Sequence, residues 1–115
     1  MIAKEIITFD ILPLNVNDSC SFALNAMDEN RVNHLPLVRE RELVGLVSEF
    51  DLVNHPDQTE PLGNVRLSMP NAFISSYQHV FDVMKMMTEL KLSLLPVVDQ
   101  RNLYQGAITL SALVR

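Results

Sequence analysis

Two short stretches of the chain carry side chains that could bind a phosphorylated sugar. The stretch GLVSEFDL, residues 45–52, has a hydroxyl at Ser48 and a carboxylate at Asp51. A strand that ends at Ser48 and a helix that begins there would present unpaired backbone N–H groups to an anion, most commonly phosphate. The Ser48 hydroxyl can donate to the same phosphate, and the Asp51 carboxylate can accept from two vicinal hydroxyls such as those of ribose.

The second stretch, GAITLSAL at residues 106–113, repeats this junction with Thr109 as the hydroxyl but with Ala112 where the acid stood. If a nucleotide binds, the first copy is therefore expected to be the stronger site. Loss of a hydrogen bond to a charged group weakens binding roughly tenfold to a hundredfold. The spacing of Ser48 and Asp51 also fits a near capping box, which stabilises a helix start without any ligand. Both interpretations stay open, and the two roles can coexist.

An internal repeat predicts the elements that position these residues. Pro36 in HLPLV and Pro96 in LLPVV lie 60 positions apart (96 − 36), and two amphipathic stripes upstream of them share that offset. The offset becomes 61 between Gly45 and Gly106, which predicts one added residue in the second hairpin turn, near residues 104–105. The stripes comprise Cys20, Ala23, Leu24 and Met27, and Val80, Val83, Met84 and Met87.

Each copy indicates the order β-α-β-β-α. The first helix is expected to be capped by Asp18 or Ser19 in one copy and by Ser76 in the other, and the second helix to begin at Ser48 and Thr109. We expect a first repeat over residues 1–55, a Pro-rich linker over 56–72 and a second repeat over 73–115. A unit of about 50 residues buries too little apolar surface to be stable alone. The fold class is therefore α+β, with the two repeats packed about a pseudo-two-fold axis.

This combination of helix, h-P-h-V strand, hairpin and G-h-h-[ST]-x-x-D junction resembles paired CBS domains, known as a Bateman module, over about residues 8–115. The resemblance implies a disc with two clefts that often hold adenine nucleotides, and a regulatory rather than catalytic role. It makes Asp51 the ribose acceptor and Ser48 a phosphate or sugar contact. It also places the main chain around His34 at the adenine edge and residues 12–14, with Leu14, along the base. Thr109 would be the corresponding hydroxyl of the second cleft.

The resemblance suggests AMP, ADP, ATP or S-adenosylmethionine as regulatory ligand, with no required cofactor. Acidic residues at positions 40, 42 and 49 favour the lightly charged AMP over ATP. The last helix stops early at Arg115, so we expect a truncated helix and an effector domain C-terminal to it. A homodimer is also expected. The alternative is a degenerate pair that serves as a ligand-free dimerisation platform, which the loss of the acid at Ala112 favours.

Composition disfavours several other classes of protein. A formal net charge of −5, with only nine scattered Lys and Arg residues, disfavours a nucleic-acid partner. The single cysteine, Cys20, excludes an internal disulfide, and neither a signal sequence nor a membrane-length apolar run is present, so we expect a cytoplasmic chain with no membrane association. The three histidines match no common zinc spacing, and no catalytic constellation is recognisable, so neither a metal site nor an enzyme is expected.

Overall fold

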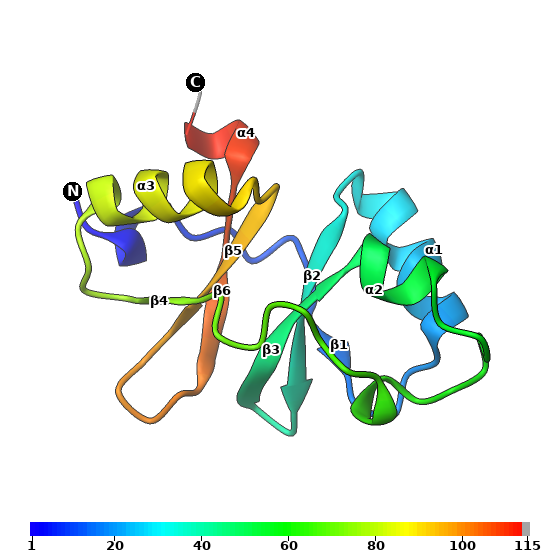
Figure 1. The fold of residues 1–115 in the computed structure, drawn as a ribbon. Coiled ribbons are helices and arrows are strands. Elements are labelled where there is room, and N and C mark those ends of the chain that lie inside the picture. The colour runs from blue at the N-terminus through cyan, green and yellow to red at the C-terminus, as the bar shows by residue number, and fades with distance from the viewer. Residues whose placement is uncertain (114–115) are drawn as a thin grey trace.

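The computed structural model describes residues 1–113. Its elements follow the order β-α-β-β-α twice, which confirms the predicted α+β tandem repeat (Figure 1). A short 3-10 helix precedes each copy: η1 (Ala3–Ile6) and η2 (Leu62–Asn64). The first copy contains β1 (Leu14–Asn15), α1 (Cys20–Asn30), β2 (His34–Arg39), β3 (Glu42–Ser48) and α2 (Glu49–Val53). The second contains β4 (Ile74–Ser75), α3 (Val80–Leu90), β5 (Leu94–Val98), β6 (Tyr104–Thr109) and α4 (Leu110–Leu113).

The two copies share one hydrophobic core. Each forms a three-stranded sheet in which the short first strand runs parallel to the second and the second runs antiparallel to the third. The sheets meet through β2 and β5, where Leu35 and Leu95 are both fully buried in a single cluster. The helices α1 and α2 lie on the first copy and α3 lies on the second (Figure 1). Because each sheet covers the other, neither copy has to bury its apolar face alone.

The long helices begin at caps of different chemistry. Ser19 caps α1 as predicted, and its hydroxyl accepts from the Phe22 N–H at 3.1 Å. The prediction of Ser76 as the cap of α3 is wrong, because the Ser76 N–H donates to the Val98 carbonyl and the residue still belongs to the extended segment. The cap of α3 is His79, whose Nδ1 accepts from the Phe81 N–H at 3.1 Å.

The amphipathic stripes are mostly buried as expected. Cys20, Ala23 and Met27 of α1 are buried, and so are Val83 and Met87 of α3. Met84 differs from the prediction, since 45% of its surface is exposed on the solvent side of α3.

The added residue of the second copy lies within the hairpin turn. In the first hairpin Val38 pairs with Leu43, whereas in the second Val98 pairs with Tyr104. The extra residue therefore falls before Tyr104, slightly earlier than the sequence comparison placed it. After the turn the register is shared, because Leu37 pairs with Gly45 and Val97 pairs with Gly106.

Each copy is covered by a segment that precedes the other copy in the chain. We call residues 1–11 the N-terminal arm and residues 61–71, inside the expected linker, the linker arm. The N-terminal arm bonds to the second copy, where Thr8 and Ala107 exchange two backbone hydrogen bonds of 2.8 and 3.3 Å. The linker arm bonds to the first copy, where the Leu46 N–H donates to the Met69 carbonyl at 3.2 Å.

The two repeated glycines allow the arms to cross the sheets closely. A Cβ atom at Gly106 would overlap Ile7 of the N-terminal arm, and its φ of +143° also disfavours any other residue. A Cβ atom at Gly45 would lie 2.8 Å from Leu67 Cδ1 and 3.2 Å from Pro70 Cα of the linker arm. The glycine of the G-h-h-[ST] motif is thus explained by arm packing in both copies.

Candidate functional site

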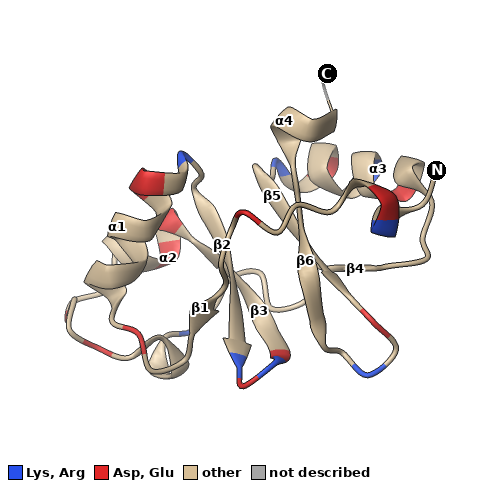
Figure 2. Cartoon of the chain, turned by 180° about the vertical axis from the view of Figure 1, so that it is seen from behind, with Lys and Arg blue, Asp and Glu red and all other residues tan. Residues whose placement is uncertain are grey.

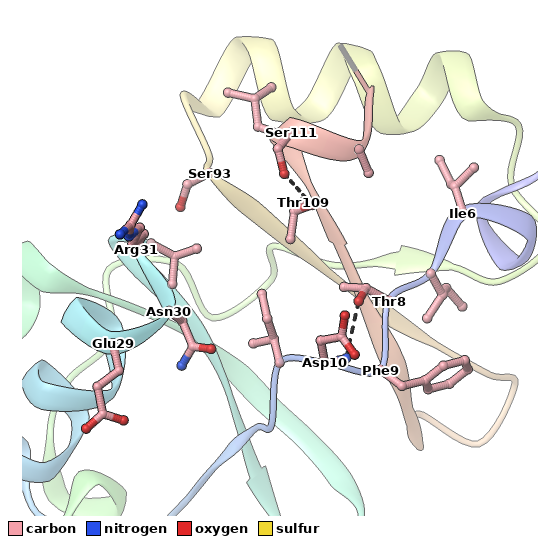
Figure 3. A pocket seen from close by; sticks show the side chains of 15 residues that line it. Ile6, Thr8, Phe9, Asp10, Glu29, Asn30, Arg31, Ser93, Thr109 and Ser111 are labelled. Atoms are coloured by element: carbon pink, nitrogen blue, oxygen red, sulfur yellow. Dashed lines mark hydrogen bonds between the residues drawn. The ribbon is translucent and has the colours of Figure 1, made fainter. Parts of the chain in front are cut away.

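A cavity of about 1180 Å³ lies where the two copies and the N-terminal arm meet (Figure 3). We call it the inter-copy cavity. The first copy contributes the end of α1 and the residues after it, and the second contributes Ser93 and the junction between β6 and α4. Its lining comprises residues 6–11, 29–32 and 109–112 together with Ser93.

Hydroxyl groups and one cation supply the donors of this cavity. The Thr109 Oγ1 and Ser111 Oγ atoms lie 3.1 Å apart, and either can donate to the other or to a ligand. Arg31 ends α1 in a left-handed conformation with φ 55°, which turns the chain out of the helix beside the cavity. In Figure 3 the side chains of Asn30 and Asp10 lie toward the space between the copies.

Ser48 and Asp51 lie together at the start of α2. The Ser48 hydroxyl accepts from the Asp51 N–H at 3.1 Å, and only 4% of Ser48 is exposed. The Asp51 Oδ2 atom accepts from the Ser68 N–H of the linker arm at 3.1 Å. The capping role is therefore present in the structure, and the Asp51 carboxylate bonds to the chain itself. The ribose contact assigned to Asp51 stays a prediction.

His34 joins the two copies. It is buried, pairs with Ser48 across the first hairpin, and its Nδ1 lies 3.1 Å from the Ser93 hydroxyl. The same Nδ1 accepts from the Ser93 N–H at 3.4 Å, which assigns the proton of the neutral ring to Nε2. Burial lowers the pKa of His34, and the nearby Asp51 carboxylate opposes that shift.

The five predicted site residues thus lie in three places. Ser48, Asp51 and His34 gather at the first junction, while Thr109 lines the inter-copy cavity. Leu14 is 2% exposed and pairs with Leu37 in the core, so it does not line the cavity.

Sequence reasoning missed Arg31, Ser93 and Asp10 as cavity residues. A signal for the first two was available, because both lie in the short connections between a helix and the strand that follows it, Arg31 directly after α1 and Ser93 directly before β5. Nothing in the sequence indicated that the N-terminal arm, with Asp10, crosses to the second copy.

Among residues 1–113 no three His, Cys, Asp or Glu side chains come together as metal ligands. Within the same part of the chain, no helix has the length and apolar character that a membrane span requires.

Comparisons with known proteins place this geometry in a family. The chain is 26% identical to inosine-5'-monophosphate dehydrogenase of Methanocaldococcus jannaschii over 98% of its own length, and it spans only 23% of that relative. A CBS domain pair/ACT domain protein from Thermotoga maritima superposes with a TM-score of 0.88 at 22% identity, over 99% of this chain and 93% of the other. CBSX2 in complex with AMP superposes with a TM-score of 0.82, again at 22% identity with 99% and 93% coverage.

A sequence model of the CBS domain matches residues 3–57 and, a second time, residues 64–115. Since the two matches together cover nearly the whole chain, the protein belongs to the CBS domain family and carries two copies of that domain.

Proposed function

We propose that the chain is a regulatory module that binds an adenosine nucleotide in the inter-copy cavity, with AMP as the preferred ligand. The observation that carries the proposal is a cavity of about 1180 Å³ whose walls come from both copies. Ligand cavities usually measure roughly 300–1,000 Å³, so the space is sufficient for a nucleotide. The similar fold of CBSX2 in complex with AMP supports this class of ligand.

The donors of the cavity suit a phosphate. The hydroxyls of Thr109 and Ser111 can donate to phosphate oxygens, and the Arg31 guanidinium can form a charge-assisted pair with them. The lining also contains the carboxylates of Asp10 and Glu29, which would repel a triphosphate more strongly than a monophosphate. The charges therefore favour AMP over ADP and ATP.

We propose that the second junction, at Thr109, binds the nucleotide more strongly than the first junction, at Ser48, although the sequence favours the reverse. At the first junction, a ribose could bind Asp51 only after its carboxylate released the Ser68 N–H. At the second junction Ala112 offers no ribose acceptor, but no comparable bond has to break for a phosphate to reach Thr109. We keep Ser48, Asp51 and His34 as a second, weaker site, whereas Leu14 is a core residue that pairs with Leu37.

A ligand can regulate a partner only if it binds two arrangements of the copies with different affinities. The His34–Ser93 contact is a suitable point of transmission, since Ser93 lines the cavity and His34 belongs to the other copy. The output is an attached or partner domain, for which a domain C-terminal to Arg115 is the natural candidate.

Calorimetric titration of AMP, ADP, ATP and S-adenosylmethionine tests the proposal. Arg31→Gln should weaken AMP binding about tenfold to a hundredfold, because it removes a charge-assisted hydrogen bond. Lys91→Gln is the matched control, since Lys91 ends α3 in the same left-handed conformation with φ 54°. If Asp51→Ala weakens binding and Arg31→Gln does not, the ligand occupies the first junction. Absence of heat from all four compounds at millimolar concentration would overturn nucleotide sensing.

A ligand-free dimerisation platform is the second candidate function. The observation that favours it is a set of exposed apolar side chains on the long helices: Phe81 (71%) and Met84 (45%) on α3 and Phe22 (54%) on α1. Burial of such groups drives association of helical surfaces. Analytical ultracentrifugation decides this point: a dimer that Phe81→Glu disrupts and AMP leaves unchanged supports the platform, and a monomer at all concentrations refutes it.

A further inference from the structure

A second cavity, of about 540 Å³, shares Ile7 and Phe9 of the N-terminal arm with the inter-copy cavity. We call it the edge cavity. It is bounded by the N-terminal arm, the residues after β4 and the turn of the β5–β6 hairpin. The charged residues that bound it lie on η1 and on that turn (Figure 2). Neither the predicted nucleotide contacts nor the Thr109 junction lies in it.

The edge cavity combines two cations with two exposed rings. Lys4 and Arg101 line it, and the Lys4 Nζ lies 5.6 Å from the centroid of the Tyr77 ring. Phe9 and Tyr77 are 77% and 63% exposed, so their faces are accessible to a planar ligand. Cations beside exposed aromatic faces suit a ring that carries a negative charge.

The one carboxylate among the described residues of the lining, that of Asp99, already accepts hydrogen bonds within the hairpin turn. Asp99 Oδ1 accepts from the N–H groups of Arg101 and Leu103 at 2.8 and 3.0 Å. Its Oδ2 accepts from the Gln105 side chain at 3.4 Å. The two cations outnumber this acid, so the edge cavity has a positive charge balance although the chain carries a formal net charge of −5.

A hydroxyl that is free to bond lies in the wall of the edge cavity. Ser76 is 6% exposed, and its backbone bonds to Val98 and Lys4. Its Oγ atom makes no hydrogen bond within residues 1–113 and keeps some contact with solvent, unlike the fully buried Tyr104 hydroxyl. The first copy has Val16 at the matching position, which is 9% exposed, so the fold itself accepts an apolar residue there. The Ser76 hydroxyl is therefore not required by the fold and can donate to a ligand in the cavity.

Three other cavity residues also differ between the copies, whereas Arg101 has its match in Arg41. Where the second copy has Tyr77 and Asp99, the first has Asn17 and Arg39. Lys4 corresponds to Gly63, because their N–H groups donate to the carbonyls of the matching residues Ser76 and Val16. The combination of the Tyr77 ring, the Lys4 cation and the Ser76 hydroxyl thus occurs in the second copy alone. We propose that the edge cavity is a second ligand site, independent of the proposed nucleotide site, which takes a small aromatic ring bearing a phosphate or carboxylate.

The roles follow from position. Arg101 and Lys4 pair with the anionic group, and Tyr77 and Phe9 stack on the ring. The hydroxyl of Ser76 and the side-chain oxygen of Gln105 bond to a polar substituent of the ring. Because Ile7 and Phe9 line both cavities, the two ligands contact the same arm.

The test is an amide-resolved NMR titration of the full chain with phenyl phosphate, and in separate arms with inorganic phosphate and phenol. We expect saturable shifts at Lys4, Ser76 and Arg101 but not at Ser111, with each fragment alone binding at least about tenfold more weakly. A carboxylate probe, benzoate, should compete. Shifts that do not saturate at millimolar phenyl phosphate, or that centre on Ser111, overturn the site.

Two variants with matched controls complete the test. Arg101→Gln should weaken phenyl phosphate binding about tenfold or more, and Arg41→Gln, at the matching hairpin position of the first copy, should not. Ser76→Val installs the residue of the first copy, so it should preserve the fold and still weaken binding by about tenfold. Wild-type affinity in both variants refutes the assignment. Neither variant should change AMP affinity, so failure of this site and failure of the nucleotide site are distinguishable.

Discussion

Substitution of the two repeated glycines tests the arm packing most directly. Gly106→Ala meets two obstacles: a φ of +143°, which alanine rarely adopts, and overlap of the new Cβ with Ile7. Such a backbone conformation costs about 1–3 kcal/mol and overpacking about 1–3 kcal/mol more. We therefore expect a loss of roughly 2–6 kcal/mol in the free energy of unfolding.

The matched substitution is Gly45→Ala, where the backbone penalty is absent. The new Cβ would lie 2.8 Å from Leu67 Cδ1, the end of a flexible side chain that can move away. Pro70 Cα at 3.2 Å must give by a few tenths of an ångström. The expected loss is about 1 kcal/mol, at the low end for overpacking.

Urea unfolding followed by circular dichroism measures both losses. Gly106→Ala should also weaken AMP binding, because the N-terminal arm that it displaces lines the inter-copy cavity. Equal losses in the two variants, or a larger loss for Gly45→Ala, would show that the N-terminal arm does not lie against β6 as described.

Three further predictions concern buried polar groups. His34 has a lowered pKa in the folded chain, so its contribution to stability is complete above the unfolded pKa of about 6.5 and is lost as the pH falls through the folded value. The difference in unfolding free energy between wild type and His34→Gln should therefore shrink on acidification, by at most about 1.4 kcal/mol per pH unit. His55→Gln is the control. A difference that does not change with pH would contradict a neutral His34 ring in the folded chain. Ser48→Ala should cost about 1 kcal/mol in urea unfolding through loss of its bond to the Asp51 N–H, and no loss would refute the capping role. Burial raises the pKa of Tyr104 to about 12, and its hydroxyl has no partner among the described residues. The free energy of unfolding should therefore fall as the pH rises from about 10 through 12, and Tyr104→Phe should be neutral or stabilising. An ordinary midpoint for the Tyr104 phenolate in an ultraviolet titration would contradict the raised pKa.

Periodicity made most of the fold predictable. Apolar stripes at helical spacing located α1 and α3, and the Pro36 and Pro96 strands located both hairpins, because these patterns reflect burial directly. The last helix could be compared only in part, since α4 is described to Leu113 and the prediction of its truncation at Arg115 lies outside the described residues.

The candidate site was less predictable, because it depends on contacts between distant segments. The pairing of Ser48 with Asp51 is local, and its capping geometry could be expected from the spacing of the two residues. The bond between Asp51 and Ser68 and the position of Asp10 in the cavity depend on where the arms cross, which no local pattern encodes. The wrong prediction of Ser76 as a helix cap has a local cause, because the offset of 60 between the copies matches the Ser19 cap with His79, a residue type that rarely caps helices.

The exchange of arms has a consequence for how such a chain can arise. A polypeptide with a single copy would have to lend its arm to a second molecule, since each arm covers the copy that it does not precede. Two such molecules would form an intertwined pair, and gene duplication with fusion would convert that pair into one chain. Residues 61–71 would then correspond to the amino terminus of the second molecule, and the single chain would keep the topology of the swapped pair.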